Sequence, residues 1–137
     1  MAIVSGMCWS FKEELLRGTH AFQTDVIKAA LYTSSASLTP WDTTAYSASN
    51  EATGTNWAAA GQALSLTAGY PTIDERSGRA LVAFDELEVA NVTVTFRSVL
   101  IYNASKANRA ILILDRGIDV VVTAGPLVLR NLTIPLS

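Results

Sequence analysis

Cys8 and His20 are the first residues to consider for chemistry, because the sequence holds one cysteine and one histidine. A single cysteine forms neither an internal disulfide nor a cluster of metal-binding thiolates. Its neighbours Met7 and Trp9 are apolar, so no adjacent charge lowers the pKa of the thiol. His20 follows a predicted helix, and no Gly-x-Ser-x-Gly motif supplies a serine nucleophile for it. We therefore interpret Cys8 as a small packing residue and His20 as a side chain that favours a helix end.

Two groups of acidic residues could provide paired carboxylates, the arrangement with which glycosidases cleave sugar linkages. One group is Asp74 with Glu75, and the other is Asp85, Glu86 and Glu88. A glycosidase holds its two carboxyl groups across a cleft and keeps one of them protonated by burial. Both groups here lie in turn-like sequence between predicted strands, which favours exposed carboxylates. The sequence therefore predicts a protein that is not an enzyme and that needs no cofactor or metal.

The composition also argues against nucleic acid and membrane partners. Half of the 137 residues are apolar and 16% are charged, whereas about 25% is typical, and the length suits one domain. Ten Lys and Arg residues face twelve Asp and Glu residues, and no basic residue occurs between positions 29 and 75. No apolar run approaches the roughly 18 residues of a membrane helix. Residues 1–9 lack the pattern of a signal peptide, so we expect synthesis in the cytoplasm.

One helix is predicted near the N-terminus. Ser10 and Glu13 have the spacing of a capping box, in which each side chain bonds to the backbone N–H of the other residue. With Gly18 at its end, the predicted helix covers residues 11–17. A helix of two turns is not stable alone and must pack on other elements. We assign residues 1–24 to an N-terminal arm that contains this helix.

The remainder, residues 25–137, is predicted to form one β-domain. Alternating or continuously apolar runs predict strands, and Arg116-Gly117 predicts a hairpin turn between two of them. Uniformly apolar residues at 99–102 further predict burial on both faces of that strand. The fold class is therefore all-β, an antiparallel β-sandwich or jelly-roll-like barrel with one short N-terminal helix and a long ordered loop. The predicted strands cover residues 25–33, 62–67, 79–84, 92–103, 109–115, 119–123 and 127–134.

The long loop, residues 34–73, is called the long excursion below. It is rich in Ser, Thr, Ala and Gly, and its large aromatic residues are Trp41, Tyr46, Trp57 and Tyr70. Large aromatics argue against a flexible linker and favour burial against another subunit. Two alternatives stay open: the excursion wraps its own domain as an Ω-loop, or its rings form a sugar-binding platform with Asn50, Asn56 and Gln62.

Several short segments together resemble small virion proteins of tailed bacteriophages. The resemblance spans about residues 25–134 and rests on a series of short matches rather than on one motif. The matching segments are DVIKAALYTS at 25–34, TTAY at 43–46, NEATGT at 50–55, AAGQAL at 59–64, RSVLIYN at 97–103 and LDRG at 114–117.

This resemblance implies a non-enzymatic virion component, in the first place a capsid cement or decoration protein. Such a protein binds the outer surface of the assembled shell as a homotrimer, so its partners are the major capsid protein and copies of itself. A tail, neck or fibre-anchoring component is the alternative within this class, and a carbohydrate-binding module is the alternative outside it. The residues expected at subunit or capsid contacts are Trp9, Trp41, Tyr46, Trp57 and Tyr70.

Overall fold

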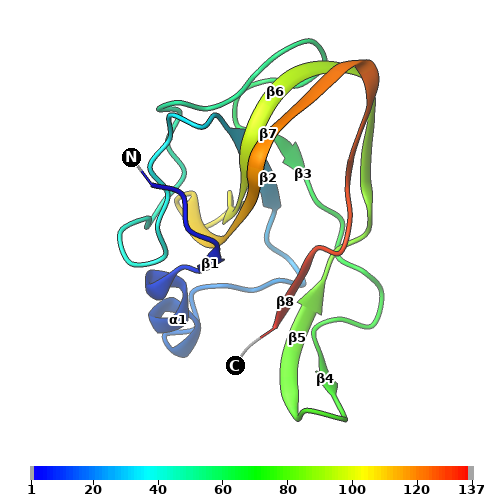
Figure 1. Cartoon of the computed structure of the whole chain (residues 1–137). Helices are drawn as coiled ribbons and strands as arrows, with labels where there is room; N and C mark the ends of the chain where they lie inside the picture. Colours follow the sequence, from blue (N-terminus) through cyan, green and yellow to red (C-terminus); the bar gives the residue numbers. More distant parts are fainter. Residues whose placement is uncertain (1, 136–137) are drawn as a thin grey trace.

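The structure is a computed structural model that describes residues 2–135, and it is mostly β (Figure 1). The strands form two antiparallel sheets, and the single α-helix of the described residues lies near the N-terminus. This arrangement confirms the predicted all-β fold class with one short helix. The elements in chain order are β1 (Gly6–Met7), α1 (Trp9–Leu16), β2 (Ile27–Tyr32), β3 (Gln62–Ala63), β4 (Thr72–Asp74), β5 (Arg79–Ala83), β6 (Leu87–Asn103), β7 (Arg109–Leu129) and β8 (Thr133–Pro135).

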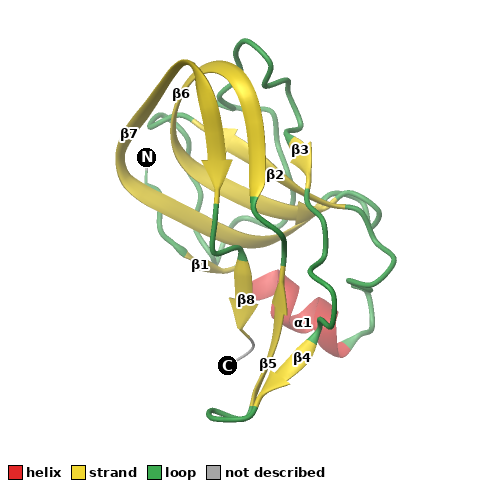
Figure 2. Ribbon diagram, turned by 90° about the vertical axis from the view of Figure 1, so that its right-hand side faces the viewer, coloured by secondary structure: helices red, strands yellow, loops and turns green. Residues whose placement is uncertain are grey.

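The larger sheet has the strand order β1-β7-β6-β2-β3, and the smaller sheet has the order β4-β5-β8. The two long strands of the larger sheet, β6 and β7, pair along most of their lengths and bend strongly (Figures 1 and 2). The register shifts at several points along this pair, which is typical of bulges that bend a sheet. The smaller sheet lies at one end of the molecule, next to α1 (Figure 2).

The predicted hairpin at Arg116-Gly117 is wrong, because β7 continues through this site. Phe96 pairs with Val120 and Ser98 pairs with Asp115, so residues 116–119 of β7 lie opposite the single residue Arg97. Both flanking segments pair with the same neighbour, β6, and the extra residues between them form a wide irregularity. A glycine with positive φ suits such a bulge as well as it suits a turn, which is why the local sequence did not separate the two.

The last predicted strand, residues 127–134, is in fact two strands in different sheets. β7 ends at Leu129 and pairs with β6, whereas β8 begins at Thr133 and pairs with β5. Asn131 lies between them with a φ of 57°, in the left-handed region. Buried side chains on either side of it, Leu129 and Leu132, anchor the chain in the core as it passes between sheets. Of the predicted strand 62–67, only β3 (Gln62–Ala63) forms, whereas the predictions at 25–33, 79–84 and 92–103 correspond to β2, β5 and β6.

The predicted capping box is also wrong. The helix begins at Trp9 rather than residue 11, its N-cap is Cys8, and no side chain caps it. The Ser10 hydroxyl is buried and has no hydrogen-bond partner among the residues described. Tertiary contacts set the start instead, since the Cys8 N–H donates to the Ile111 carbonyl at 2.9 Å and the Trp9 N–H to the Pro40 carbonyl at 2.8 Å.

The N-terminal segment and the long excursion both pack into the common core. β1 pairs with β7, and Cys8 and Phe11 are core residues, so the described part of the segment 1–24 is built into the domain. From the excursion, Ala36, Leu38, Ala52 and Trp57 are buried in the same cluster. The excursion therefore wraps its own domain along much of its length, as the Ω-loop alternative predicts.

Candidate functional site

Cys8 is withdrawn from solvent and acts as a packing residue. Its side chain is fully buried, and it is a free thiol. Burial, together with the nearby Glu14 carboxylate, raises the pKa of this thiol to about 12. A thiol with so high a pKa is protonated at neutral pH and is a poor nucleophile.

His20 lies at the centre of a partly buried set of polar side chains, which we call the His20 network. Its Nε2 is 2.8 Å from Glu14 Oε1, and its Nδ1 is 2.9 Å from Asn103 Nδ2. The imidazole has no exposed surface, so it is inaccessible to a substrate. Both ring nitrogens are occupied by these contacts, and neither partner is a nucleophile. The network consists of Glu14, His20, Asp25, Asn103, Lys106 and Arg109.

The ends of the His20 network are ion pairs with basic residues. Arg109 Nε donates to Glu14 Oε2 at 2.7 Å, and Lys106 Nζ lies 3.0 Å from Asp25 Oδ1. Asn103 Nδ2 donates to Asp25 Oδ2 at 2.7 Å and joins the two halves. His20 therefore connects α1 to the β6–β7 turn, a role that its position after a helix did not predict.

Of the acidic residues, Glu75, Asp85 and Glu86 lie between strands as the sequence predicts, whereas Asp74 is the last residue of β4 and Glu88 lies within β6. Asp74 accepts hydrogen bonds from the Arg76 N–H and the Ser77 hydroxyl, both at 3.0 Å, and so stabilises the turn between β4 and β5. Asp85 accepts a bond from the Thr67 hydroxyl at 2.8 Å and stays exposed. Within residues 2–135, no three His, Cys, Asp or Glu side chains come together as a potential metal site. Within the described residues, no helix is long and apolar enough to cross a membrane.

The aromatic residues of the long excursion do not share one exposed surface. Trp57 is fully buried, so it presents no side-chain surface to a partner. Tyr46 is half-buried and stacks on Tyr102, with ring centroids 4.9 Å apart. Tyr70 is also half-buried and packs against the core. A flat sugar-binding platform made of Trp41, Tyr46, Trp57 and Tyr70 is therefore not assembled in this structure.

Trp41 instead pairs with Trp9, and both rings are exposed. Their centroids lie 6.2 Å apart with an interplanar angle of 58°, and the two residues are 60% (Trp9) and 50% (Trp41) exposed. Backbone contacts hold the two segments together, since the Trp9 N–H bonds to the carbonyl of Pro40, the residue before Trp41. Trp9 and Trp41 were predicted from the sequence as contact residues separately, but nothing in the local pattern indicated that the two rings pair.

The exposed apolar surface extends along α1 from this pair. Leu16 is 92% exposed and lies seven residues after Trp9, which places both on the same side of the helix. We call Trp9, Trp41 and Leu16 the tryptophan surface. A single exposed apolar residue is ordinary, but two paired indoles with a leucine on the same side of the helix are typical of a contact surface.

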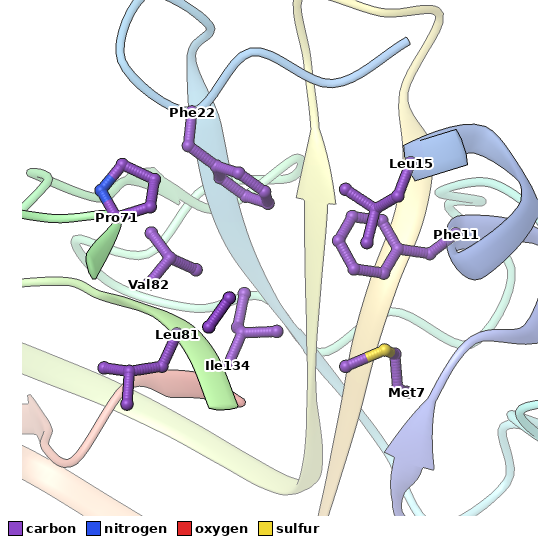
Figure 3. Close-up of a pocket in the computed structure, with 9 residues that line it drawn as sticks. Met7, Phe11, Leu15, Phe22, Pro71, Leu81, Val82 and Ile134 are labelled. Carbon is purple, nitrogen blue, oxygen red and sulfur yellow. The ribbon is translucent and has the colours of Figure 1, made fainter. Parts of the chain in front are cut away.

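An apolar cavity of about 180 Å³ lies between α1 and the smaller sheet (Figure 3). Phe11 and Leu15 enter it from the helix, and Val82 and Ile134 enter it from β5 and β8. None of its lining side chains is titratable, so the cavity offers no group for acid–base or nucleophilic chemistry. The full lining is Met7, Phe11, Leu15, Phe22, Pro71, Ala80, Leu81, Val82 and Ile134.

Comparisons with known proteins add no relative to this picture: neither the protein-family models nor the curated proteins nor the solved structures searched give a match to this chain.

Proposed function

We propose that this chain is a non-enzymatic structural protein of a tailed-phage virion, in the first place a capsid cement or decoration protein. The observation that carries the proposal is the exposed Trp9–Trp41 pair. Large aromatic side chains that stay exposed in a folded chain supply much of the binding free energy when a partner buries them. The resemblance to small virion proteins supplies the identity of the partners, namely the major capsid protein and further copies of this chain.

The accessibility of the chemical groups supports binding over catalysis. Cys8 and His20 are both buried, and the acidic residues near the turns are exposed and serve those turns. Large apolar side chains, by contrast, are available to another molecule at Trp9, Trp41 and Leu16. Buried reactive groups together with exposed apolar side chains favour a protein that binds a partner over one that catalyses a reaction.

A cement protein stabilises the shell through mass action. A ligand that binds the assembled shell and not its separated subunits shifts the equilibrium toward assembly. Repeated over the many symmetric positions of a capsid, a modest contact at each site adds up to a large resistance to disassembly. The tryptophan surface is the part of this chain that we assign to that contact.

Co-sedimentation with expanded phage shells prepared without this chain tests the proposal. Wild-type protein is expected to sediment with the shells, and Trp9→Ala and Trp41→Ala to bind about 30-fold more weakly or worse, the loss typical of a central aromatic contact. Val121→Ala is a matched control, because Val121 is exposed but lies on β7 outside the tryptophan surface. Equal binding by all variants, or no binding by wild type, would contradict a shell contact at this surface.

Copy number separates the shell from the tail. Hundreds of copies in each purified particle, counted by quantitative mass spectrometry, favour a capsid location, and a dozen or fewer favour a neck, tail or fibre anchor. Light scattering on the purified chain tests the homotrimer, since a strict monomer at high concentration counts against self-association.

A further inference from the structure

The hydrogen-bond partners of the His20 network determine which ring nitrogen of His20 carries the proton. The Ser105 N–H donates to Asn103 Oδ1 at 3.0 Å, which orients the amide so that Nδ2 faces His20 and Asp25. An amide nitrogen donates and does not accept, so His20 Nδ1 must be the acceptor of this contact. The ring is therefore neutral, with its hydrogen on Nε2 and donated to Glu14.

We propose that the His20 network is an acid-sensitive latch that holds α1 against the larger sheet. A proton added at Nδ1 points directly at the hydrogens of Asn103 Nδ2. Two hydrogen-bond donors then face each other, and the hydrogen bond between His20 and Asn103 is lost. The ring is fully buried, so water does not replace the lost hydrogen bond. Releasing this contact removes the link from α1 through His20 to Asn103 on β6, and the ion pair with Arg109 is then the side-chain link that remains between Glu14 and the larger sheet.

The surrounding charges do not supply a free partner for a charged imidazole. Glu14 favours a positive ring, but its carboxylate is already bonded to Arg109, and Asp25 is likewise paired with Lys106. The aromatic rings of Phe11 and Phe22 pack against the imidazole from the remaining sides. The charged groups around His20 are Glu14 from α1, which contacts the ring, and Asp25 from the loop before β2, Lys106 from the β6–β7 turn and Arg109 from β7, which bond to its partners.

The latch also controls the tryptophan surface, because α1 carries both Trp9 and Leu16. Because Trp41 lies on a different segment, a looser α1 is expected to leave the backbone bond from the Trp9 N–H to Pro40 as the main restraint on the Trp9–Trp41 pair. The latch itself does not depend on the proposed virion function, since it follows from contacts within the chain.

Amide hydrogen exchange of the full chain tests the latch. When the pH is lowered from about 7.5 to about 5.5, the α1 amides are expected to lose protection after correction for intrinsic rates. The loss reaches at most about tenfold per pH unit, because one proton is linked to release. The amides of β2 and of the second half of β6 are expected to keep their protection.

Two variants provide the comparison. His20→Gln keeps a donor and an acceptor but does not titrate, so the change in α1 protection is expected to disappear. Asn103→Asp places an acceptor opposite Nδ1 and a second carboxylate beside Asp25, so acid is expected to tighten α1 rather than loosen it. Unchanged α1 protection in the wild type, or the same loss in His20→Gln, overturns the latch.

Nitrogen NMR of the imidazole keeps the proposal testable if a variant fails to fold. In wild-type protein the neutral ring is expected to carry its hydrogen on Nε2, with Nδ1 accepting from the Asn103 amide. A neutral ring with its hydrogen on Nδ1 overturns the assignment on which the latch depends.

Discussion

Tyr46 and Tyr102 stack with ring centroids 4.9 Å apart and an interplanar angle of 21°, and this contact ties the long excursion to β6. Each hydroxyl bonds back to the excursion: Tyr46 donates to Glu51 Oε1 at 2.6 Å, and Tyr102 donates to the Ala60 carbonyl at 2.5 Å. Desolvation by burial and the hydrogen bond to Glu51 raise the pKa of Tyr46 to about 12. A ring expected at a subunit contact is thus part of the fold's own packing.

Removing the Tyr46 hydroxyl is therefore expected to weaken the fold. Tyr46→Phe keeps the stack but loses the bond to Glu51, which predicts a decrease of about 1 kcal/mol in the free energy of unfolding. Urea denaturation measures the change. Tyr70→Phe, at another half-buried tyrosine of the excursion, is the control. An equal loss of unfolding free energy in Tyr70→Phe would show that the loss in Tyr46→Phe does not come from the hydrogen bond to Glu51.

Gly61 is expected to tolerate no side chain. A Cβ at this position would overlap the Ala29 carbonyl of β2, and the residue has a positive φ of 76°. Gly61→Ala therefore strains the backbone and also pushes the excursion off the sheet, with an expected loss of more than about 2 kcal/mol.

Gly69→Ala is the matched control for Gly61→Ala. Gly69 also has a positive φ, 90°, but open space surrounds the place of its Cβ. This variant is expected to lose only the conformational cost of about 1–2 kcal/mol. Equal losses in the two variants, measured by urea denaturation, would contradict the role of the contact with Ala29.

Asp25 is expected to contribute to stability against acid. Burial alone would raise its pKa, but hydrogen bonds from Asn103 and the Ala21 N–H and the charge of Lys106 lower it to about 2. Because the folded pKa lies below the unfolded value, the stabilisation is complete above about pH 4 and is lost as pH falls toward 2.

Asp25→Asn tests this contribution. The variant is expected to lose about 2 kcal/mol at neutral pH and to show a flatter decline between about pH 4 and pH 2. Asp119→Asn, at an exposed carboxylate of β7, is the control. Parallel acid profiles for wild type and Asp25→Asn would show that Asp25 does not cause the decline.

The three tryptophans are expected to divide into one that folds the chain and two that bind a partner. Trp57→Ala removes a fully buried side chain and predicts a loss of about 3–5 kcal/mol in the free energy of unfolding. Trp9→Ala and Trp41→Ala remove exposed rings and are expected to cost less than about 1 kcal/mol. Thermal or urea denaturation of the three variants checks the division, and a large loss in Trp9→Ala or Trp41→Ala would assign that ring to the fold.

The strands themselves were largely predictable, because alternation of apolar and polar residues is a local property. The run that became the first half of β6 shows it, whereas β-branched and aromatic content indicated β2 and a short apolar run indicated β5. The apolar run at 99–102 correctly indicated burial on both faces of β6. The irregularity at 116–119 and the break at Asn131 were not predictable in the same way. A positive φ there fits a turn, a bulge or a change of sheet, and only the pairing partner distinguishes them.

The amino-acid sequence by itself determined the β-rich class of this protein, the short helix and the scarcity of reactive groups, since these follow from residue types and short-range periodicity. The tertiary structure alone decided that Trp9 meets Trp41, that Trp57 turns inward and that His20 lies between Glu14 and Asn103. The Trp9–Trp41 and His20–Asn103 contacts join residues distant in the chain. Such contacts form only when the whole core packs, because the free energy that selects them comes from burying many side chains at once.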